Sequence, residues 1–259
     1  MAKRLLIFLA TLALVVLAFY VYSMNKEAMK SDNKAAYSTI AIVWKDALID
    51  EDNTAQNYNI NVIYPQFNAL NNKTSQENIN ADIKGMMDNE VVNFKKQLSS
   101  GGLLPTQMKG IKSSLVITNE VVRADNIVSV QFRVMEAITG MAHPNNFNLI
   151  YNYDVAAGQT LGIGDIFKLD ANYVQKLSDI AEAEIIKQKD IAENPNAGDF
   201  VSEGAGPKTE NFQLFTLSSD TLTLIFNPAT VAPDYIGTVD VAIPYTDIAD
   251  ILNPQIRLQ

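Results

Sequence analysis

The sequence predicts an α+β protein, in which antiparallel strands are covered on one face by helices. Several stretches alternate apolar and polar side chains, as strands with one buried face do. Two other stretches repeat apolar side chains every three or four positions, as amphipathic helices do. Helices that could cross over between paired parallel strands are too few for a doubly wound sheet, so the α+β class is favoured.

The clearest alternation lies in the middle of the chain. Val128, Val130, Phe132 and Val134 share one face of a predicted strand, and Ser129, Gln131 and Arg133 share the other. Asp125-Asn126 suits a turn before this strand. We expect strands 115–122, 127–138 and 147–155 to form an antiparallel meander. Further strands are expected at 58–67, 212–217, 222–226 and around 239–243, in the overall order β-β-α-β-β-β-α-β-β-β-α.

Two amphipathic helices are expected to cover these strands. The first carries an apolar stripe from Ile79 through Phe94 to Leu98, and Thr74 with Glu77 has the spacing of a capping box. The second is expected to begin at an Asp170 cap and to bury the side that holds Val174, Leu177, Ala181 and Ile185. Residues 193–210 are rich in glycine and proline and predict a long loop, whereas 247–252 predicts a short terminal helix.

The N-terminus contains a hydrophobic segment of transmembrane length. Leu5 to Tyr22 is a run of 18 uncharged residues, which as a helix would be about 27 Å long. Lys3 and Arg4 precede it and predict that the rest of the chain lies outside the cytoplasm. No A-x-A cleavage site follows, so a signal anchor is favoured over a cleavable signal peptide.

Composition excludes several kinds of chemistry. The chain has no cysteine and a single histidine, His143, so no thiolate catalysis and no multi-histidine metal site are expected. A formal charge of −9 disfavours nucleic-acid binding and favours cationic partners. No cofactor motif is present. A pair of catalytic carboxylates stays open, because the separation of such a pair is set by the fold.

Three segments carry a family resemblance. Ala142–Phe167 contains a His-Pro pair, a strand ending in Tyr-Asp, a glycine turn and Asp-Ile-Phe. Leu217–Leu252 contains a strand ending in Phe, then Ala-Pro, a glycine and a strand closing on Ile-Pro-Tyr. Ile60–Phe67 (INVIYPQF) precedes a helix. In this order the segments resemble the RsiV/PdaC-like extracytoplasmic module family, over roughly residues 38–252.

The resemblance implies a division of the chain. Residues 1–23 would be the signal anchor and 24–37 a linker, followed by the N-terminal half (38–140) and the C-terminal half (141–259) of the module. The family occurs in a lysozyme-sensing anti-sigma factor and beside the metal-dependent catalytic domain of a peptidoglycan deacetylase. We expect neither the sigma-binding segment nor the catalytic domain here, and therefore a binding module that is not an enzyme.

The leading hypothesis is a membrane-anchored, extracytoplasmic sensor or binding module, on the periplasmic side or the cell surface. Its implied partner is a cationic lysozyme-type muramidase or peptidoglycan. The alternatives are a carboxylate-dependent cell-wall enzyme and an envelope scaffold that binds other membrane proteins. The expected ligand-binding residues are His143, Pro144, Asn145 and Asn146, since this loop joins two strands and offers polar groups on a rigid sheet. The same residues would also suit a purely structural turn.

Overall fold

The structure, a computed structural model, describes residues 42–100, 111–256 and 258. These residues lie in one compact unit, Ala41–Gln259. The predicted signal anchor and linker lie outside the described residues, and within those residues no helix is long and apolar enough to cross a membrane. The boundary expected between the two halves, at 140/141, stays a prediction.

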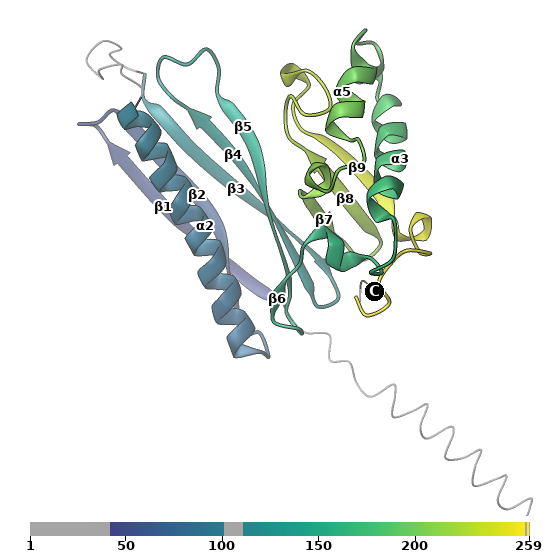
Figure 1. Cartoon of the computed structure of the whole chain (residues 1–259). Coiled ribbons are helices and arrows are strands. Elements are labelled where there is room, and N and C mark those ends of the chain that lie inside the picture. The colour runs from purple at the N-terminus through teal and green to yellow at the C-terminus, as the bar shows by residue number, and fades with distance from the viewer. Residues whose placement is uncertain (1–41, 101–110, 257, 259) are drawn as a thin grey trace, which may run out of the picture. The chain divides into compact units, whose positions relative to one another are not determined.

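A six-stranded sheet forms the first part of the unit, with the strand order β1-β2-β3-β4-β5-β6 (Figure 1). The antiparallel meander predicted for β3, β4 and β5 is confirmed. The expected α+β class with antiparallel sheets is confirmed, with one exception: β2 and β3 run parallel. The intervening helix returns the chain to the end of the sheet where β2 began, so β3 takes the same direction. The strands are β1 Val43–Asn53, β2 Tyr58–Asn68, β3 Ser113–Ala124, β4 Ile127–Ala137, β5 Asn145–Asp154 and β6 Gln159–Thr160.

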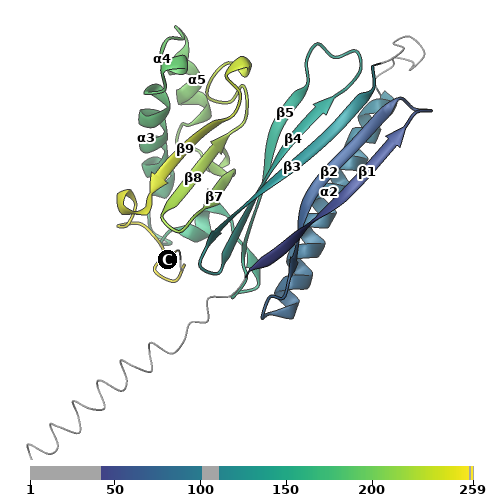
Figure 2. The same cartoon turned by 180° about the vertical axis from the view of Figure 1, so that it is seen from behind.

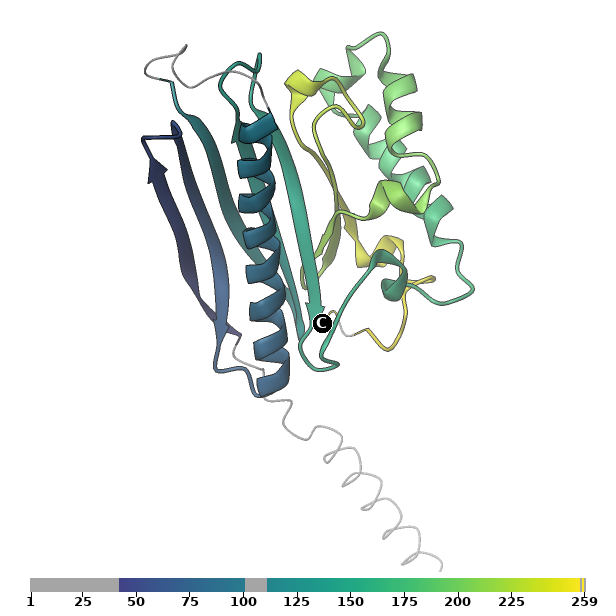
Figure 3. The ribbon, with the colours of Figure 1, turned by 60° about the vertical axis from the view of Figure 1, so that its left-hand side comes forward.

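Helix α2, Lys73–Ser100, covers one face of this sheet (Figure 3). Its predicted stripe is confirmed: Ile79, Ile83, Met87 and Phe94 are fully buried. The expected capping box of Thr74 and Glu77 is wrong. The cap comes instead from Asn72, whose Oδ1 accepts a hydrogen bond from the backbone N–H of Ser75 at 3.1 Å, as a residue preceding the first turn can.

A three-stranded antiparallel sheet follows, with the order β7-β8-β9. Helices α3 and α5 lie on the face of this sheet that points away from the six-stranded sheet (Figure 1). Apolar side chains of α3, such as Leu177 and Ile185, share one core with Leu224 of β8 and Val241 of β9. The elements are α3 Tyr173–Ile186, α4 Lys189–Ala192, α5 Ala197–Gly204, β7 Phe215–Leu217, β8 Thr221–Phe226 and β9 Val239–Pro244.

The prediction of a long loop at residues 193–210 is wrong, because helix α5 occupies much of this segment. Glycine in this segment serves close packing: a Cβ on Gly204 would lie 2.2 Å from the carbonyl oxygen of Thr230. Val201 and Ala197 are buried on the same helix. The segment is therefore helical because it packs, although its composition is typical of loops.

Two smaller expectations about helices are also wrong. Helix α3 begins at Tyr173, after Asn172, so Asp170 is not its cap. The predicted terminal helix 247–252 is replaced by a single 3₁₀ turn, Tyr245–Asp247. The chain after this turn pairs with the segment before α3, where Asn253 N–H donates to the carbonyl oxygen of Ile166 at 2.9 Å. Residues 249–251 form a turn, in which Leu252 N–H donates to the carbonyl oxygen of Ile248 at 3.1 Å, and the pairing at Leu252 and Asn253 ends this turn.

The three-stranded sheet lies on the face of the six-stranded sheet opposite α2 (Figure 2). Polar side chains of β4 and β5 join the two sheets. Ser129 Oγ accepts a hydrogen bond from Leu217 N–H at 2.9 Å, and Asn152 Nδ2 donates to Phe215 O at 2.9 Å. Asn148 Nδ2 donates to Thr238 Oγ1 at 2.9 Å. The polar face of the alternation in β4 and β5 is thus buried in part by the second sheet.

Candidate binding site

One end of the six-stranded sheet gathers three connections. The β1–β2 turn (residues 54–57), the start of β3 and the β4–β5 connection (residues 138–144) lie there, as the pairings Asn53↔Tyr58 and Ser114↔Ala137 require. We call this the hairpin end. Val43, the first residue of β1, lies at the opposite end of the sheet. The hairpin end is therefore far from the point where the preceding chain joins the unit.

Hydrogen bonds tie these connections to one another. Asn57 Nδ2 donates to Ile111 O at 2.8 Å, and Thr139 Oγ1 donates to the same oxygen at 3.2 Å. Thr139 N–H also donates to Ser113 Oγ at 2.9 Å. Such bonds between separate segments restrain loops that would otherwise be flexible, so the surface they present is ordered in advance of any contact.

The four residues expected to bind a ligand all lie at this end and are exposed. His143 and Pro144 belong to the connection and line a hollow of about 400 Å³ together with Ile111 and Lys112. His143 Nδ1 lies 3.1 Å from Pro144 O. Asn145 and Asn146 open β5 and line no part of that hollow. Of the four predicted residues, His143 and Pro144 therefore line the hollow.

A buried carboxylate beside this loop is a feature that the sequence reasoning missed. Glu136 is only 5% exposed, and its oxygens accept hydrogen bonds from Gln97 Nε2 at 2.8 Å and Asn145 Nδ2 at 3.4 Å. Burial, with a smaller contribution from the charge of Glu136, raises the pKa of Glu90 on α2. The signal was present in the alternation, because Glu136 continues the inward-facing positions of β4 after Val134.

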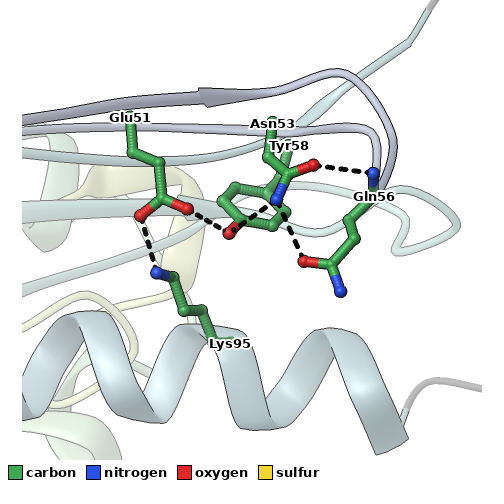
Figure 4. A network of polar contacts seen from close by, with 5 residues as sticks. All are labelled: Glu51, Asn53, Gln56, Tyr58 and Lys95. Carbon is green, nitrogen blue, oxygen red and sulfur yellow. Dashed lines mark hydrogen bonds and ion pairs between the residues drawn. The ribbon is translucent and has the colours of Figure 1, made fainter.

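A second polar network joins α2 to the β1–β2 hairpin (Figure 4). Lys95 Nζ lies 2.6 Å from Glu51 Oε2, and the hydroxyl of Tyr58 donates to the other oxygen of Glu51. Lys95 first, and then Tyr58, lower the pKa of the Glu51 carboxyl. Glu51 in turn raises the pKa of Lys95. The network holds the last turns of α2 against the hairpin end.

The outer face of β1, opposite α2, is acidic. Asp46, Asp50 and Asp52 are exposed and alternate along the strand. Lys112 pairs with Asp52. No group of three histidine or acidic side chains among the described residues is arranged to hold a metal ion.

Comparison with known proteins shows which proteins this chain is similar to. Residues 164–246 match the family model described as "Protein of unknown function (DUF3298)". The chain is also 30% identical over 263 aligned residues to peptidoglycan-N-acetylmuramic acid deacetylase PdaC of Bacillus subtilis (strain 168). The alignment covers 98% of this chain and 52% of that protein, so the chain spans about half the length of its relative. These matches support a PdaC-like module.

Solved structures support the same fold. A DUF3298 family member from Bacteroides fragilis NCTC 9343 superposes with a TM-score of 0.62 at 18% identity, covering 83% of this chain and 95% of that one. A DUF3298 family protein from Pseudomonas aeruginosa PAO1 gives a TM-score of 0.50 at 14% identity, covering 82% and 93%. At these identities the likeness concerns the fold alone.

Proposed function

We propose that this chain is an extracytoplasmic binding module of the cell envelope, which captures a cell-wall-related ligand at the hairpin end. A cationic lysozyme-type muramidase is the proposed partner. The observation that carries the proposal is the hairpin end itself: exposed polar side chains beside a hollow of about 400 Å³, on connections restrained by hydrogen bonds. Binding groups tend to lie on loops of this kind above a rigid sheet.

Similarity supports the cell-wall setting of this proposal. Nearly the whole chain aligns with a protein whose name is that of a peptidoglycan deacetylase. The hydrophobic run Leu5–Tyr22, preceded by Lys3 and Arg4, supports a membrane anchor with the module on the outer side. In that arrangement the module would face the wall that its relative modifies.

Charge supports a cationic partner. The formal charge of the chain is −9, and Asp46, Asp50 and Asp52 are exposed on the outer face of β1. Asp52 pairs with Lys112, which also lines the hollow beside His143. An acidic surface of this kind accelerates the encounter with a basic protein, and the acceleration weakens as salt is added.

A second function, the carboxylate-dependent wall enzyme, is favoured by one observation. Burial, and after it the charge of Glu136, raises the pKa of Glu90. Glycoside hydrolysis needs two carboxyl groups of which one stays protonated near neutral pH. Glu136 is engaged by Gln97 and Asn145, however, and is 5% exposed. This burial favours a structural role, so binding remains the main proposal.

A turbidity assay distinguishes these functions. The purified full chain is added to a suspension of bacterial walls, with and without lysozyme, and a second acidic protein of similar charge serves as the control. Protection of the walls from lysozyme is the result expected of the binding module. Clearing without lysozyme, abolished by Glu90→Gln, would support the enzyme instead. If the chain neither protects the walls from lysozyme nor clears them by itself, both proposed functions are contradicted.

A further inference from the structure

Another cavity lies in the C-terminal part of the unit, and none of its lining residues belongs to the hairpin end. It has a volume of about 730 Å³ and is lined by the end of β9 and by residues of the segment 252–256, among others. Its apolar lining includes Pro244, Leu252, Pro254 and Ile256. A concave site of this size with apolar walls is typical of sites for small ligands. We call it the tail cavity.

Two side chains of opposite charge belong to the lining, Lys168 and Asp220. Lys168 Nζ donates a hydrogen bond to Asp250 O at 2.6 Å, which leaves two of its three N–H donors for other partners. Asp220 Oδ1 accepts hydrogen bonds from Ser218 Oγ at 2.8 Å and Thr221 Oγ1 at 3.0 Å. Oδ2 takes part in neither bond. The hydroxyl of Ser218, followed by that of Thr221, lowers the pKa of Asp220, so the carboxylate is charged at neutral pH.

The walls of the tail cavity are fixed by hydrogen bonds from segments far apart in the sequence. Lys168 N–H donates to Ile251 O at 2.9 Å, and Asn253 N–H donates to Ile166 O at 2.9 Å. Tyr245, which is 7% exposed, donates through its hydroxyl to Ser218 O at 2.7 Å. The last segment is thus held in place across the cavity. A cavity whose walls are already ordered loses little conformational entropy when a ligand enters.

We propose that the tail cavity binds a short apolar peptide with a free amino group and a free carboxylate. The amino group would bind Asp220, the carboxylate would bind Lys168, and the apolar side chains would contact Pro244, Leu252 and Ile256. One acid and one base on a single apolar cavity complement a zwitterion with an apolar body better than a ligand with one charge. This site is separate from the hairpin end and does not rest on the proposed muramidase binding.

The test uses the full chain and four synthetic peptides in calorimetric titrations. The probe is the tripeptide Ala-Ala-Leu with both termini free, and it is compared with its N-acetylated, its C-amidated and its doubly blocked forms. Each blocking group is expected to weaken binding by about tenfold or more, the usual effect of losing a charge-assisted hydrogen bond. Equal binding of all four peptides, or no binding of the free peptide, would overturn the proposal.

Variants assign each terminus to its partner. Asp220→Asn is expected to bind the free and the N-acetylated peptides equally weakly, while it still discriminates against the C-amide. Lys168→Gln is expected to show the opposite pattern. Glu203→Gln and Lys208→Gln, which change exposed residues outside the lining, are the matched controls and should bind like the unmodified chain. If both lining variants keep full discrimination between the four peptides, the assignment is wrong. The comparison of the four peptides on the unmodified chain still tests the proposal if a variant folds poorly.

Discussion

Removal of the Phe94 ring tests how α2 is held on the sheet. Phe94 is fully buried, and its ring meets the ring of Tyr58 edge-on, with centroids 6.1 Å apart and planes at 86°. Phe94→Ala deletes the ring from a packed site, where the remaining cavity adds to the lost transfer free energy. We expect the free energy of unfolding to fall by about 3–5 kcal/mol.

The assay is denaturant unfolding of the full chain, followed by circular dichroism, with Val92→Ala as the control. Val92 lies on the same helix but is 57% exposed, so its replacement should change the free energy of unfolding by no more than about 0.5 kcal/mol. A loss below about 1 kcal/mol for Phe94→Ala, or equal losses for both variants, would refute the reasoning about which face of α2 is buried.

Three further predictions concern packing and charge. Gly204→Ala should destabilise the protein by about 1–3 kcal/mol, because the new Cβ would meet Thr230 O; Gly198→Ala, with nothing within 4 Å, should not destabilise it, as thermal unfolding would show. Glu90→Gln should raise the free energy of unfolding at pH 7, because the raised pKa of Glu90 means that the folded state disfavours the ionised carboxylate. The gain should be less than about 1 kcal/mol, since Glu90 is only partly buried and solvent screens its charge. That gain should vanish below the ordinary pKa of 4.5, and a gain that persists at lower pH would contradict it. Lys95→Met should cost less than about 1 kcal/mol at neutral pH. Because the pKa of Glu51 is lowered, its ion pair with Lys95 loses its contribution to stability as the pH falls below 4.5 and through that lowered pKa. Lys95→Met should make this loss of stability smaller. An unchanged loss of stability in acid would contradict this role of the Lys95–Glu51 pair.

Local patterns were sufficient for the elements whose burial is set by one neighbouring layer. The alternation in β4 and the stripe on α2 place Phe132 and Phe94 in the core, as predicted. The parallel pairing of β2 and β3 could not be predicted in the same way, because strand direction depends on the path of the chain through α2. Helix α5 was missed because Gly204 serves a contact with Thr230, and that contact exists only after folding.

The candidate site was partly visible in the sequence. The exposed positions of His143 and Pro144 match the loop that the Asn- and Pro-containing segment predicts. Glu136 could have been found, since an acidic residue at an inward-facing strand position is unusual and signals a buried polar contact. The tail cavity could not be found from the sequence, because Lys168 and Asp220 are distant in the sequence. They come together with the segment 252–256 only in the fold.

The central claim is that the hairpin end captures its partner, and a direct binding titration tests it. Lysozyme is titrated onto the immobilised full chain and onto the double variant His143→Ala, Asn146→Ala, with Asp199→Asn as the control. These side chains are exposed, so the melting temperature should stay unchanged. We predict that the double variant binds at least about tenfold more weakly, whereas the control binds normally. Equal affinity of the double variant and the unmodified chain, or no binding of lysozyme to either, would contradict the proposed function.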